Sequence, residues 1–274
     1  NNVGEFSPTL FIIEPFIFKR DRSQQKKSFY KIRRHSSKFY RIMKEIVLIR
    51  IEEMNVTGLF ITIEGPDGAG KSSLVQKLIP AIESMIDCPL VVTREPGGSE
   101  IAEEIREILL NPAHTAMDPR TEALLLAASR RQHVVEKILP ALSRGEIVLC
   151  DRFVDSSVAY QGQARGIGME KVLSINEFAI EGLTPDMTLY LDVEAEVGLE
   201  RIKDKNSNRT QDRLEMEAIT FHEEVRNAYQ MMIEKEPDRF VVIDAAKSQD
   251  SVFDAAEKAL KSAIEDFKKT NEKG

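Results

Sequence analysis

The hydrophobic positions of the chain form five short runs that are rich in β-branched residues. Each run is bounded by glycine, proline or polar residues, which is typical of strands buried within a sheet. Such strands carry apolar side chains on both faces, so we expect each to be covered on both sides. The predicted strands lie at residues 59–64, 89–93, 146–150, 187–193 and 240–243.

Segments with apolar residues at helical spacing separate the predicted strands. Every gap is long enough for a crossover connection, so the alternation predicts an α/β protein with a five-stranded parallel sheet covered by helices on both faces. Ligands in such folds bind beyond the carboxyl ends of the strands. The predicted helices lie at 72–85, 100–110, 119–142, 154–161, 169–181, 194–203, 214–235 and 249–268.

Three of these helices carry more detailed expectations. Ser99 is predicted to be the N-cap of helix 100–110. The centre of the long helix, residues 123–128, is apolar nearly all round and is therefore expected to be buried. The tail from Lys269 onward is expected to fray.

A phosphate loop connects the first predicted strand to the first predicted helix. Residues 65–72 read Gly-Pro-Asp-Gly-Ala-Gly-Lys-Ser and fit the pattern GxxxxGK[ST]. Glycines let backbone N–H groups turn towards phosphate oxygens, the lysine approaches the β- and γ-phosphates, and the serine hydroxyl is offered to Mg²⁺. The chain is therefore expected to bind a nucleoside triphosphate. The predicted contacts are Gly65, Pro66, Asp67, Gly68, Ala69, Gly70, Lys71, Ser72 and Ser73.

A second anion site is predicted from arginines near strand ends. A phosphoryl acceptor that is itself a phosphate needs its own cations. Arg94 follows the second predicted strand, Arg152 follows the third, and Arg130 lies on the long helix. Asp151 closes the third strand, where a carboxylate holds Mg²⁺ directly or through water; capping of the next helix is a compatible role.

The polar stretch at about 203–213 predicts a basic flap. It contains Lys203, Lys205, Arg209 and Arg213 around an Asn-Ser-Asn sequence. Because the phosphate loop has no arginine, we expect this flap to close over the donor phosphates and supply the missing cation. A solvated charged loop is the alternative interpretation.

Charge divides the chain into two parts. Residues 1–53 hold 12 basic and 6 acidic residues, a net charge of +6, whereas 54–274 hold 26 and 39, a net charge of −13. The acidic part argues against an extended face for a nucleic acid polymer. No apolar run approaches the roughly 20 residues of a membrane span. Cys88 and Cys150 form no disulfide framework, so we expect reduced thiols in a cytoplasmic protein.

The basic leader, residues 1–53, has three competing interpretations. It is an organellar transit peptide, a disordered basic arm, or non-native sequence translated in front of the true start. We favour the third, because Met54 stands just before the first convincing strand and residue 1 is not methionine. Mass spectrometry of the N-terminus of natively expressed protein would decide.

Several ordered motifs make residues 54–263 resemble the bacterial thymidylate kinase family, over about four-fifths of the chain. The resemblance implies a nucleoside monophosphate kinase fold for 54–274, a homodimer, and the reaction ATP + dTMP → ADP + dTDP with Mg²⁺. The motifs are Glu-Gly-Pro-Asp-Gly-Ala-Gly-Lys-Ser (64–72), Thr-Arg-Glu-Pro-Gly-Gly (93–98), Ala-Ala-Ser-Arg-Arg-Gln-His (127–133), Asp-Arg-Phe-Val-Asp-Ser-Ser-Val-Ala-Tyr-Gln (151–161), Asp-Arg-Leu-Glu (212–215) and Phe-His (221–222).

By matched position, the resemblance implies how the acceptor is held. Asp67 accepts a hydrogen bond from the deoxyribose 3′-hydroxyl, and Arg94 and Arg152 hold the acceptor phosphate. Arg130 orients the nucleotide or its phosphate. Tyr160 lies under the sugar and disfavours a ribose 2′-hydroxyl.

The same matching assigns the base contacts and shows one departure. Ser157 and Gln161 meet the thymine edge. The family usually has Phe, which stacks on thymine, where this chain has Leu126; the loss of stacking is worth about 0.5–1.5 kcal/mol. The flap arginine falls on Arg209, with Arg213 as a second candidate.

No protein nucleophile or general base is expected, because the dTMP phosphate oxygen is already anionic. Catalysis is then positioning and charge neutralisation by Lys71, Arg152, Arg209 and Mg²⁺. Two other functions compete: a kinase for another nucleoside or nucleotide, and a P-loop protein that binds nucleotide as a switch without turnover. The first would need a carboxylate base for a nucleoside acceptor, and the second would lack the acceptor-site residues.

Overall fold

The computed structural model describes residues 56–205 and 213–271. The leader at 1–53, Arg209 and the centre of the predicted flap lie outside these ranges, so the expectations for them stay predictions.

The core of the fold is a five-stranded sheet in the order β2-β3-β1-β4-β5, with every neighbouring pair parallel. All five predicted strands and the parallel sheet are confirmed. The register pairs Asp151 with Ile63 of β1 and with Arg94 of β2, so the ends of these strands meet at one edge. The strands are β1 (Leu59–Glu64), β2 (Leu90–Arg94), β3 (Ile147–Asp151), β4 (Met187–Asp192) and β5 (Phe240–Asp244).

Helical segments connect the strands, and two of them have π geometry. The π segments are η1 (Val134–Ile138) and η2 (Val158–Ala164). The α-helices are α2 (Lys71–Met85), α3 (Glu100–Leu110), α4 (Pro119–His133), α5 (Leu139–Ser143), α6 (Val154–Ser157), α7 (Met169–Ile180), α8 (Ala195–Lys205), α9 (Ile219–Lys235) and α10 (Gln249–Asn271).

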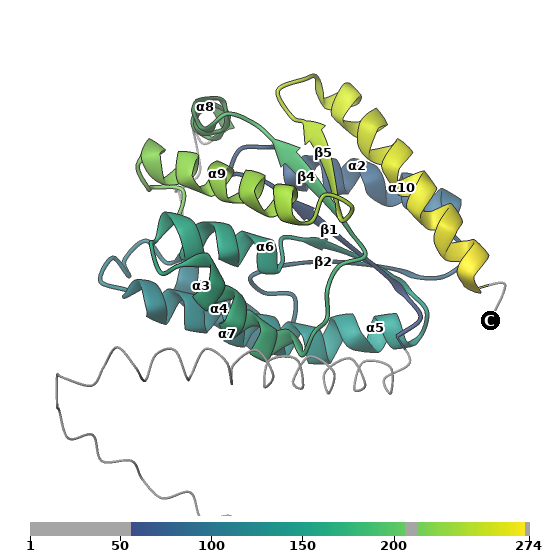
Figure 1. The fold of residues 1–274 in the computed structure, drawn as a ribbon, viewed down its shortest axis with the longest axis horizontal. Helices are drawn as coiled ribbons and strands as arrows, with labels where there is room; N and C mark the ends of the chain where they lie inside the picture. Colours follow the sequence, from purple (N-terminus) through teal and green to yellow (C-terminus); the bar gives the residue numbers. More distant parts are fainter. Residues whose placement is uncertain (1–55, 206–212, 272–274) are drawn as a thin grey trace, which may run out of the picture. The chain divides into compact units, whose positions relative to one another are not determined.

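Helices cover both faces of the sheet (Figure 1), and an apolar layer lies on each face, as the strand pattern predicts. Ile61 and Ile63 of β1 point into a layer formed with α2 and α10. Phe60, from the same strand, points the other way into a layer that includes residues of η1, α6, η2 and α9. This alternation follows from the two-residue period of a strand. Among the described helices, none is long and apolar enough to cross a bilayer.

Several predicted boundaries are wrong. The long helix predicted at 119–142 is an exception: its extent is confirmed, because α4, η1 and α5 follow one another without a gap from Pro119 to Ser143, with π geometry in the middle. The helix predicted to begin at 214 begins at Ile219, because residues 214–216 form turns. The last helix does not fray at Lys269: it continues to Asn271, and the Lys269 ammonium pairs with Asp266 at 3.0 Å in its final turns. Ser99 does stand at the N-cap of α3, but its buried hydroxyl finds no partner among the described residues.

The expected burial of residues 123–128 is also only partly correct. Ala123, Leu126 and Ala127 are buried, whereas the Leu124 side chain is 56% exposed and Ala128 is exposed. The buried side of α4 packs against α3, α7 and η2, whereas Leu124 and Ala128 lie on its exposed side. The apolar sequence of 123–128 therefore predicts more burial than these residues show in the described part of the chain.

Candidate active site

A cavity of about 410 Å³ opens beyond the carboxyl ends of β1, β2 and β3. The position agrees with the general rule for parallel sheets. Three predicted phosphate-loop residues, Gly65, Pro66 and Ala69, do not line it. The predicted site residues that do are Asp67, Gly68, Gly70, Lys71, Ser72, Ser73, Arg94, Leu126, Arg130, Asp151, Arg152, Ser157, Tyr160 and Gln161.

Two kinds of contact hold the phosphate loop in place: hydrogen bonds from Lys71 and close packing against α8. Lys71 donates from Nζ to the carbonyl oxygens of Gly65 and Pro66, at 2.9 and 2.7 Å. A Cβ at Gly68 would lie 2.0 Å from the Gly198 carbonyl oxygen, so the loop can rest against α8 only with glycine there. Burial, together with the neighbouring Arg152, lowers the pKa of the Lys71 ammonium to about 8.

Two oxygen-bearing side chains meet at the start of α2 and the end of β3. Ser72 Oγ donates to Asp151 Oδ2 at 3.2 Å. The other carboxylate oxygen, Oδ1, is buried and has no hydrogen-bond partner in the described part of the chain. Hydroxyl and carboxylate oxygens are hard donors of the kind Mg²⁺ prefers, so this pair fits the metal that the sequence predicts. The described residues contain no group of three or more His, Cys, Asp or Glu side chains suited to a metal, so further ligands would have to be phosphate oxygens and water.

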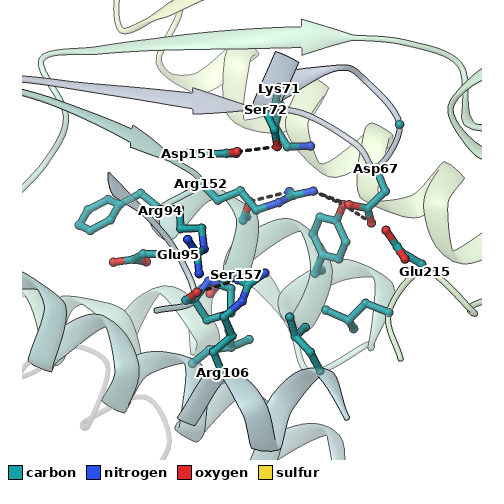
Figure 2. A pocket seen from close by; sticks show the side chains of 18 of the residues that line it. Asp67, Lys71, Ser72, Arg94, Glu95, Arg106, Asp151, Arg152, Ser157 and Glu215 are labelled. Atoms are coloured by element: carbon teal, nitrogen blue, oxygen red, sulfur yellow. Dashed lines mark hydrogen bonds and ion pairs between the residues drawn. The ribbon is translucent and has the colours of Figure 1, made fainter. Parts of the chain in front are cut away.

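Arg152 spans the centre of the cavity, as Figure 2 shows. Its Nη2 pairs with Asp67 Oδ1 at 2.5 Å, and its Nη1 donates to Ser156 Oγ at 3.0 Å. Tyr160 supports both partners: its ring lies 5.0 Å from the guanidinium carbon, and its hydroxyl donates to Asp67 Oδ2 at 2.8 Å. Burial alone would raise the pKa of Asp67, but Arg152 and Lys71 hold it below its usual value. Asp67 of the phosphate loop is therefore in direct contact with Arg152 and Tyr160, which the sequence assigns to the acceptor site.

The backbone of Arg152 is in the left-handed region, with φ of 70°, which is unfavourable for a residue with a Cβ. Glu64 holds the chain that follows it. Its Oε1 accepts from the Phe153 N–H at 2.6 Å, and its Oε2 accepts from Ser156 Oγ at 2.6 Å and from the Tyr229 hydroxyl at 2.7 Å. Burial, and to a smaller extent the nearby Asp155 carboxylate, raises the pKa of Glu64 to about 7. Sequence reasoning gave Glu64 no role, although an acid ending an apolar strand was a visible signal.

The other predicted phosphate ligand, Arg94, is more accessible. Its guanidinium is about half exposed and bonds both carboxylate oxygens of Glu103 at 3.0–3.1 Å. Arg106, which the sequence analysis missed, lies on α3 and also lines the cavity. Its Nη1 donates to the Pro96 carbonyl at 2.7 Å. Helical spacing was the available signal, because Arg106 comes three residues after Glu103 and so shares its face.

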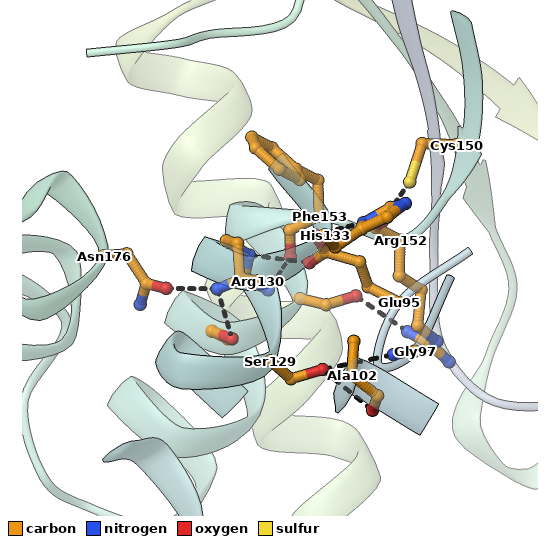
Figure 3. Close-up of polar contacts among 12 residues, drawn as sticks. Glu95, Gly97, Ala102, Ser129, Arg130, His133, Cys150, Arg152, Phe153 and Asn176 are labelled. Atoms are coloured by element: carbon orange, nitrogen blue, oxygen red, sulfur yellow. Dashed lines mark hydrogen bonds and ion pairs between the residues drawn. The ribbon is translucent and has the colours of Figure 1, made fainter. Parts of the chain in front are cut away.

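Arg130 is almost fully buried and is held by four polar groups (Figure 3). Its guanidinium donates to Glu95 Oε2 at 2.6 Å, to Ser157 Oγ at 3.0 Å, to the Phe153 carbonyl at 2.9 Å and to Asn176 Oδ1. Four of its five N–H donors are therefore used within the protein, which fixes the side chain at the cavity wall.

Leu126, Ser157 and Gln161 also line the cavity. Leu126 and Arg130 are one turn apart on α4, so both face the cavity. The Gln161 amide donates from Nε2 to Glu122 Oε1 at 2.7 Å. Arg213 also binds this carboxylate, at Oε2, and donates from Nε to the Leu109 carbonyl at 3.1 Å. Arg213, the second candidate for a flap arginine, is thus bound to Glu122 and to the end of α3, because a buried carboxylate needs cationic partners.

A phosphate loop and a separate arginine-lined region share one cavity at the carboxyl edge of a parallel sheet. This combination defines a P-loop kinase, in which a triphosphate donor meets an anionic acceptor. The protein-family model described as thymidylate kinase matches residues 63–256. The chain therefore belongs to the thymidylate kinase family, and it is an enzyme, a phosphotransferase.

Individual relatives agree with this assignment. A thymidylate kinase from Lacticaseibacillus casei strain BL23 is 58% identical over 197 residues, which cover 72% of this chain and 92% of that protein. A thymidylate kinase from a Geobacillus species is 54% identical over 209 residues, covering 76% and 98%. The crystal structure of thymidylate kinase from Ehrlichia chaffeensis superposes with a TM-score of 0.60 at 31% identity, and covers 74% of this chain and 98% of that one.

Proposed function

We propose that the enzyme transfers the γ-phosphoryl group of ATP to dTMP. The observation that carries this proposal is the position of Arg152, whose guanidinium lies in the same cavity as Lys71 and Arg94. A guanidinium there meets both the transferring and the accepting phosphate. A nucleoside acceptor is less well supported, because it carries no phosphate and would not need this second group of cations.

The donor triphosphate is assigned to the phosphate loop and the start of α2. Lys71 approaches the β- and γ-phosphates, and the N-terminus of α2 adds its partial positive charge. A second cavity of about 180 Å³ adjoins the same loop and is lined in part by Lys77, Arg201 and Lys247. We place the donor nucleoside there.

The acceptor is assigned to the larger cavity. Arg94 and Arg152 bind its phosphate, Asp67 accepts from the 3′-hydroxyl, and Arg130 orients the nucleotide. The base lies against Leu126 and meets Ser157 and Gln161, while Tyr160 packs under the sugar. Support comes from the cavity, which brings all of these side chains together although they lie far apart in the sequence.

The chemical step needs no protein base, because a phosphate oxygen is the nucleophile. The protein aligns donor and acceptor and neutralises the charge that develops on the transferring group. Arg209 of the flap is proposed as a further cation. Exclusion of water by the closed flap strengthens these electrostatic interactions.

Mg²⁺ is proposed to bind at Ser72 and Asp151, where it would shield the phosphates. We expect Asp151→Asn to raise the Mg²⁺ concentration needed for half-maximal activity by about 10-fold or more, the usual scale for losing an outer ligand. Titration of activity with Mg²⁺ at saturating nucleotide measures this. Asp87→Asn, at an exposed ion pair with Lys268, serves as the control. An unchanged Mg²⁺ requirement in Asp151→Asn would exclude this site.

The substrate is tested by a coupled ADP-release assay over a panel of nucleosides and nucleoside monophosphates. Turnover restricted to dTMP and close analogues is the expected result. Turnover only with a nucleoside, or nucleotide binding without any turnover, would replace the proposal with one of its two rivals.

We also propose that two copies of residues 54–274 associate through α3, α4 and α7. These neighbouring helices carry large apolar side chains that are 41–87% exposed in the single chain. Exposed apolar groups on adjacent elements are typical of protein–protein interfaces. The residues are Ile101, Ile108, Leu124, Leu173 and Phe178.

The charged variant Phe178→Glu should therefore be monomeric at micromolar concentration, because a carboxylate would be desolvated in the interface. Light scattering after size-exclusion chromatography measures the mass. Met231→Glu, at an apolar position on α9 that is 43% exposed, should leave the dimer intact. A monomeric wild-type enzyme, or a dimeric Phe178→Glu variant, would contradict this interface.

A cytoplasmic location stays a prediction. Cys88 and Cys150 are free thiols, which is compatible with this prediction.

A further inference from the structure

We propose that Glu122 determines base specificity by fixing the side-chain amide of Gln161 in one of its two orientations. The inference rests on the proposed function, in which Gln161 meets the edge of the acceptor base. Glu122 does not line the cavity, so it acts through Gln161 and is a positioning residue.

The orientation follows from the chemistry of the partner. Gln161 and Glu122 are each only 1% exposed, and Nε2 of the amide lies 2.7 Å from Glu122 Oε1. The carboxylate also accepts from Arg165 at 3.4 Å and from Arg213 at 2.5 Å. A carboxylate between two guanidinium groups only accepts hydrogen bonds, so it selects the NH₂ end of the amide.

The remainder of the Gln161 amide is left for the ligand. Its carbonyl oxygen, Oε1, has no hydrogen-bond partner among the described residues. This oxygen is not fully enclosed by the described residues, and Gln161 lines the cavity. The amide therefore offers the cavity one acceptor, Oε1, beside one N–H donor. Rotating it by 180° would bring Oε1 against the Glu122 carboxylate and lose a charge-assisted bond in a buried place.

This acceptor–donor order distinguishes the pyrimidines. Thymine and uracil carry an N3–H donor next to a carbonyl acceptor, which complements Oε1 and the N–H of Gln161. Cytosine carries an N3 acceptor next to an amino group, so its lone pair would oppose Oε1. A freely rotating glutamine would accommodate either base. With Glu122 in place, only a base with an N–H at this edge pairs without a buried mismatch.

The position of Glu122 makes it a rigid orienting group. It lies in the first turn of α4, whose N-cap Asp118 accepts from the backbone N–H groups of Arg120 and Thr121. Arg165 is itself packed over the Phe221 ring, 4.7 Å from its centre. The orientation of Gln161 is thus set by contacts outside the cavity, before any nucleotide binds.

The test compares kcat/KM for dTMP, dUMP and dCMP in wild type and in Glu122→Gln. A glutamine at 122 can face Gln161 with either its oxygen or its NH₂ group, which frees the rotation. We expect the dCMP/dTMP ratio to rise about 10-fold or more, since one well-placed polar contact discriminates at least that strongly. The dUMP/dTMP ratio should not change, because both bases share the same edge.

Two further variants separate orientation from general loosening of the fold. Arg165→Gln removes an ion pair of the same carboxylate but leaves the bond to Gln161, so the dCMP/dTMP ratio should stay at the wild-type value. In a Gln161→Ala background, adding Glu122→Gln should no longer change that ratio. An equal loss of kcat/KM for all three substrates in Glu122→Gln would overturn the proposal and leave Glu122 a structural role only.

A measurement on the wild-type enzyme covers the case in which Glu122→Gln does not fold. The side-chain amide signals of Gln161, identified by their loss in Gln161→Met, should show one proton protected from exchange, because it is donated to a buried carboxylate. Rapid exchange of both protons would overturn the proposal. Wild-type enzyme without turnover of dTMP would instead refute the proposed function itself, so the two failures are distinguishable.

Discussion

Arg152→Ala is expected to lower kcat for dTMP phosphorylation by about 100-fold or more, the usual scale for losing a charge contact made in the transition state. In the structure, this guanidinium bonds to Asp67 and to Ser156 and lies in the cavity with Lys71. It is therefore held where we propose that the donor and acceptor phosphates meet. Steady-state kinetics with saturating ATP and dTMP measures the effect.

Two further variants test whether the effect is specific to the Arg152 guanidinium. Arg144→Ala removes an arginine whose exposed guanidinium pairs with Glu146, and it should keep the wild-type kcat. Arg152→Lys keeps the charge but loses the fork that binds two partners at once, so it should recover only part of the rate. A near wild-type kcat in Arg152→Ala would show that this residue does not stabilise the transition state.

The features that could be predicted from the sequence depend on neighbouring residues. Five apolar runs indicated the strands, and the glycine spacing of 65–72 indicated the phosphate loop, because both signals lie within a few residues. The positions of Arg94 and Asp151 just after strands were enough to place them at one sheet edge, and the register now pairs them directly. The topology then brings the rest of the site together.

The features that could not be predicted depend on partners far apart in the sequence. Glu64 meets Tyr229 across 165 positions, and Glu122 meets Arg213 across 91. Hydrophobic periodicity carries no information on such pairs. Similarly, an apolar run around Leu124 predicts burial but does not say whether this chain or another copy provides the cover.

Lys71→Ala should be as severe as Arg152→Ala, again about 100-fold or more in kcat. We propose that the ammonium is the positive group that the phosphate loop brings to the β- and γ-phosphates. It also bonds two carbonyl oxygens of the loop, so its loss removes both charge and loop support. Measured kcat and the affinity for ATP separate the two effects: loss of charge lowers kcat, whereas a loosened loop mainly weakens binding. Lys268→Ala, at an exposed ion pair with Asp87, is the control.

The lowered pKa of Lys71 adds a dependence on pH that an arginine does not share. With a pKa of about 8 in the free enzyme, the ammonium loses its proton as pH rises through 8, and the charge needed by the phosphates is lost with it. kcat/KM for ATP should therefore fall on the alkaline side in the wild type. Lys71→Arg should be less active at every pH but should lack this fall, because a guanidinium stays protonated. If both enzymes show the same alkaline fall, a group other than Lys71 titrates there.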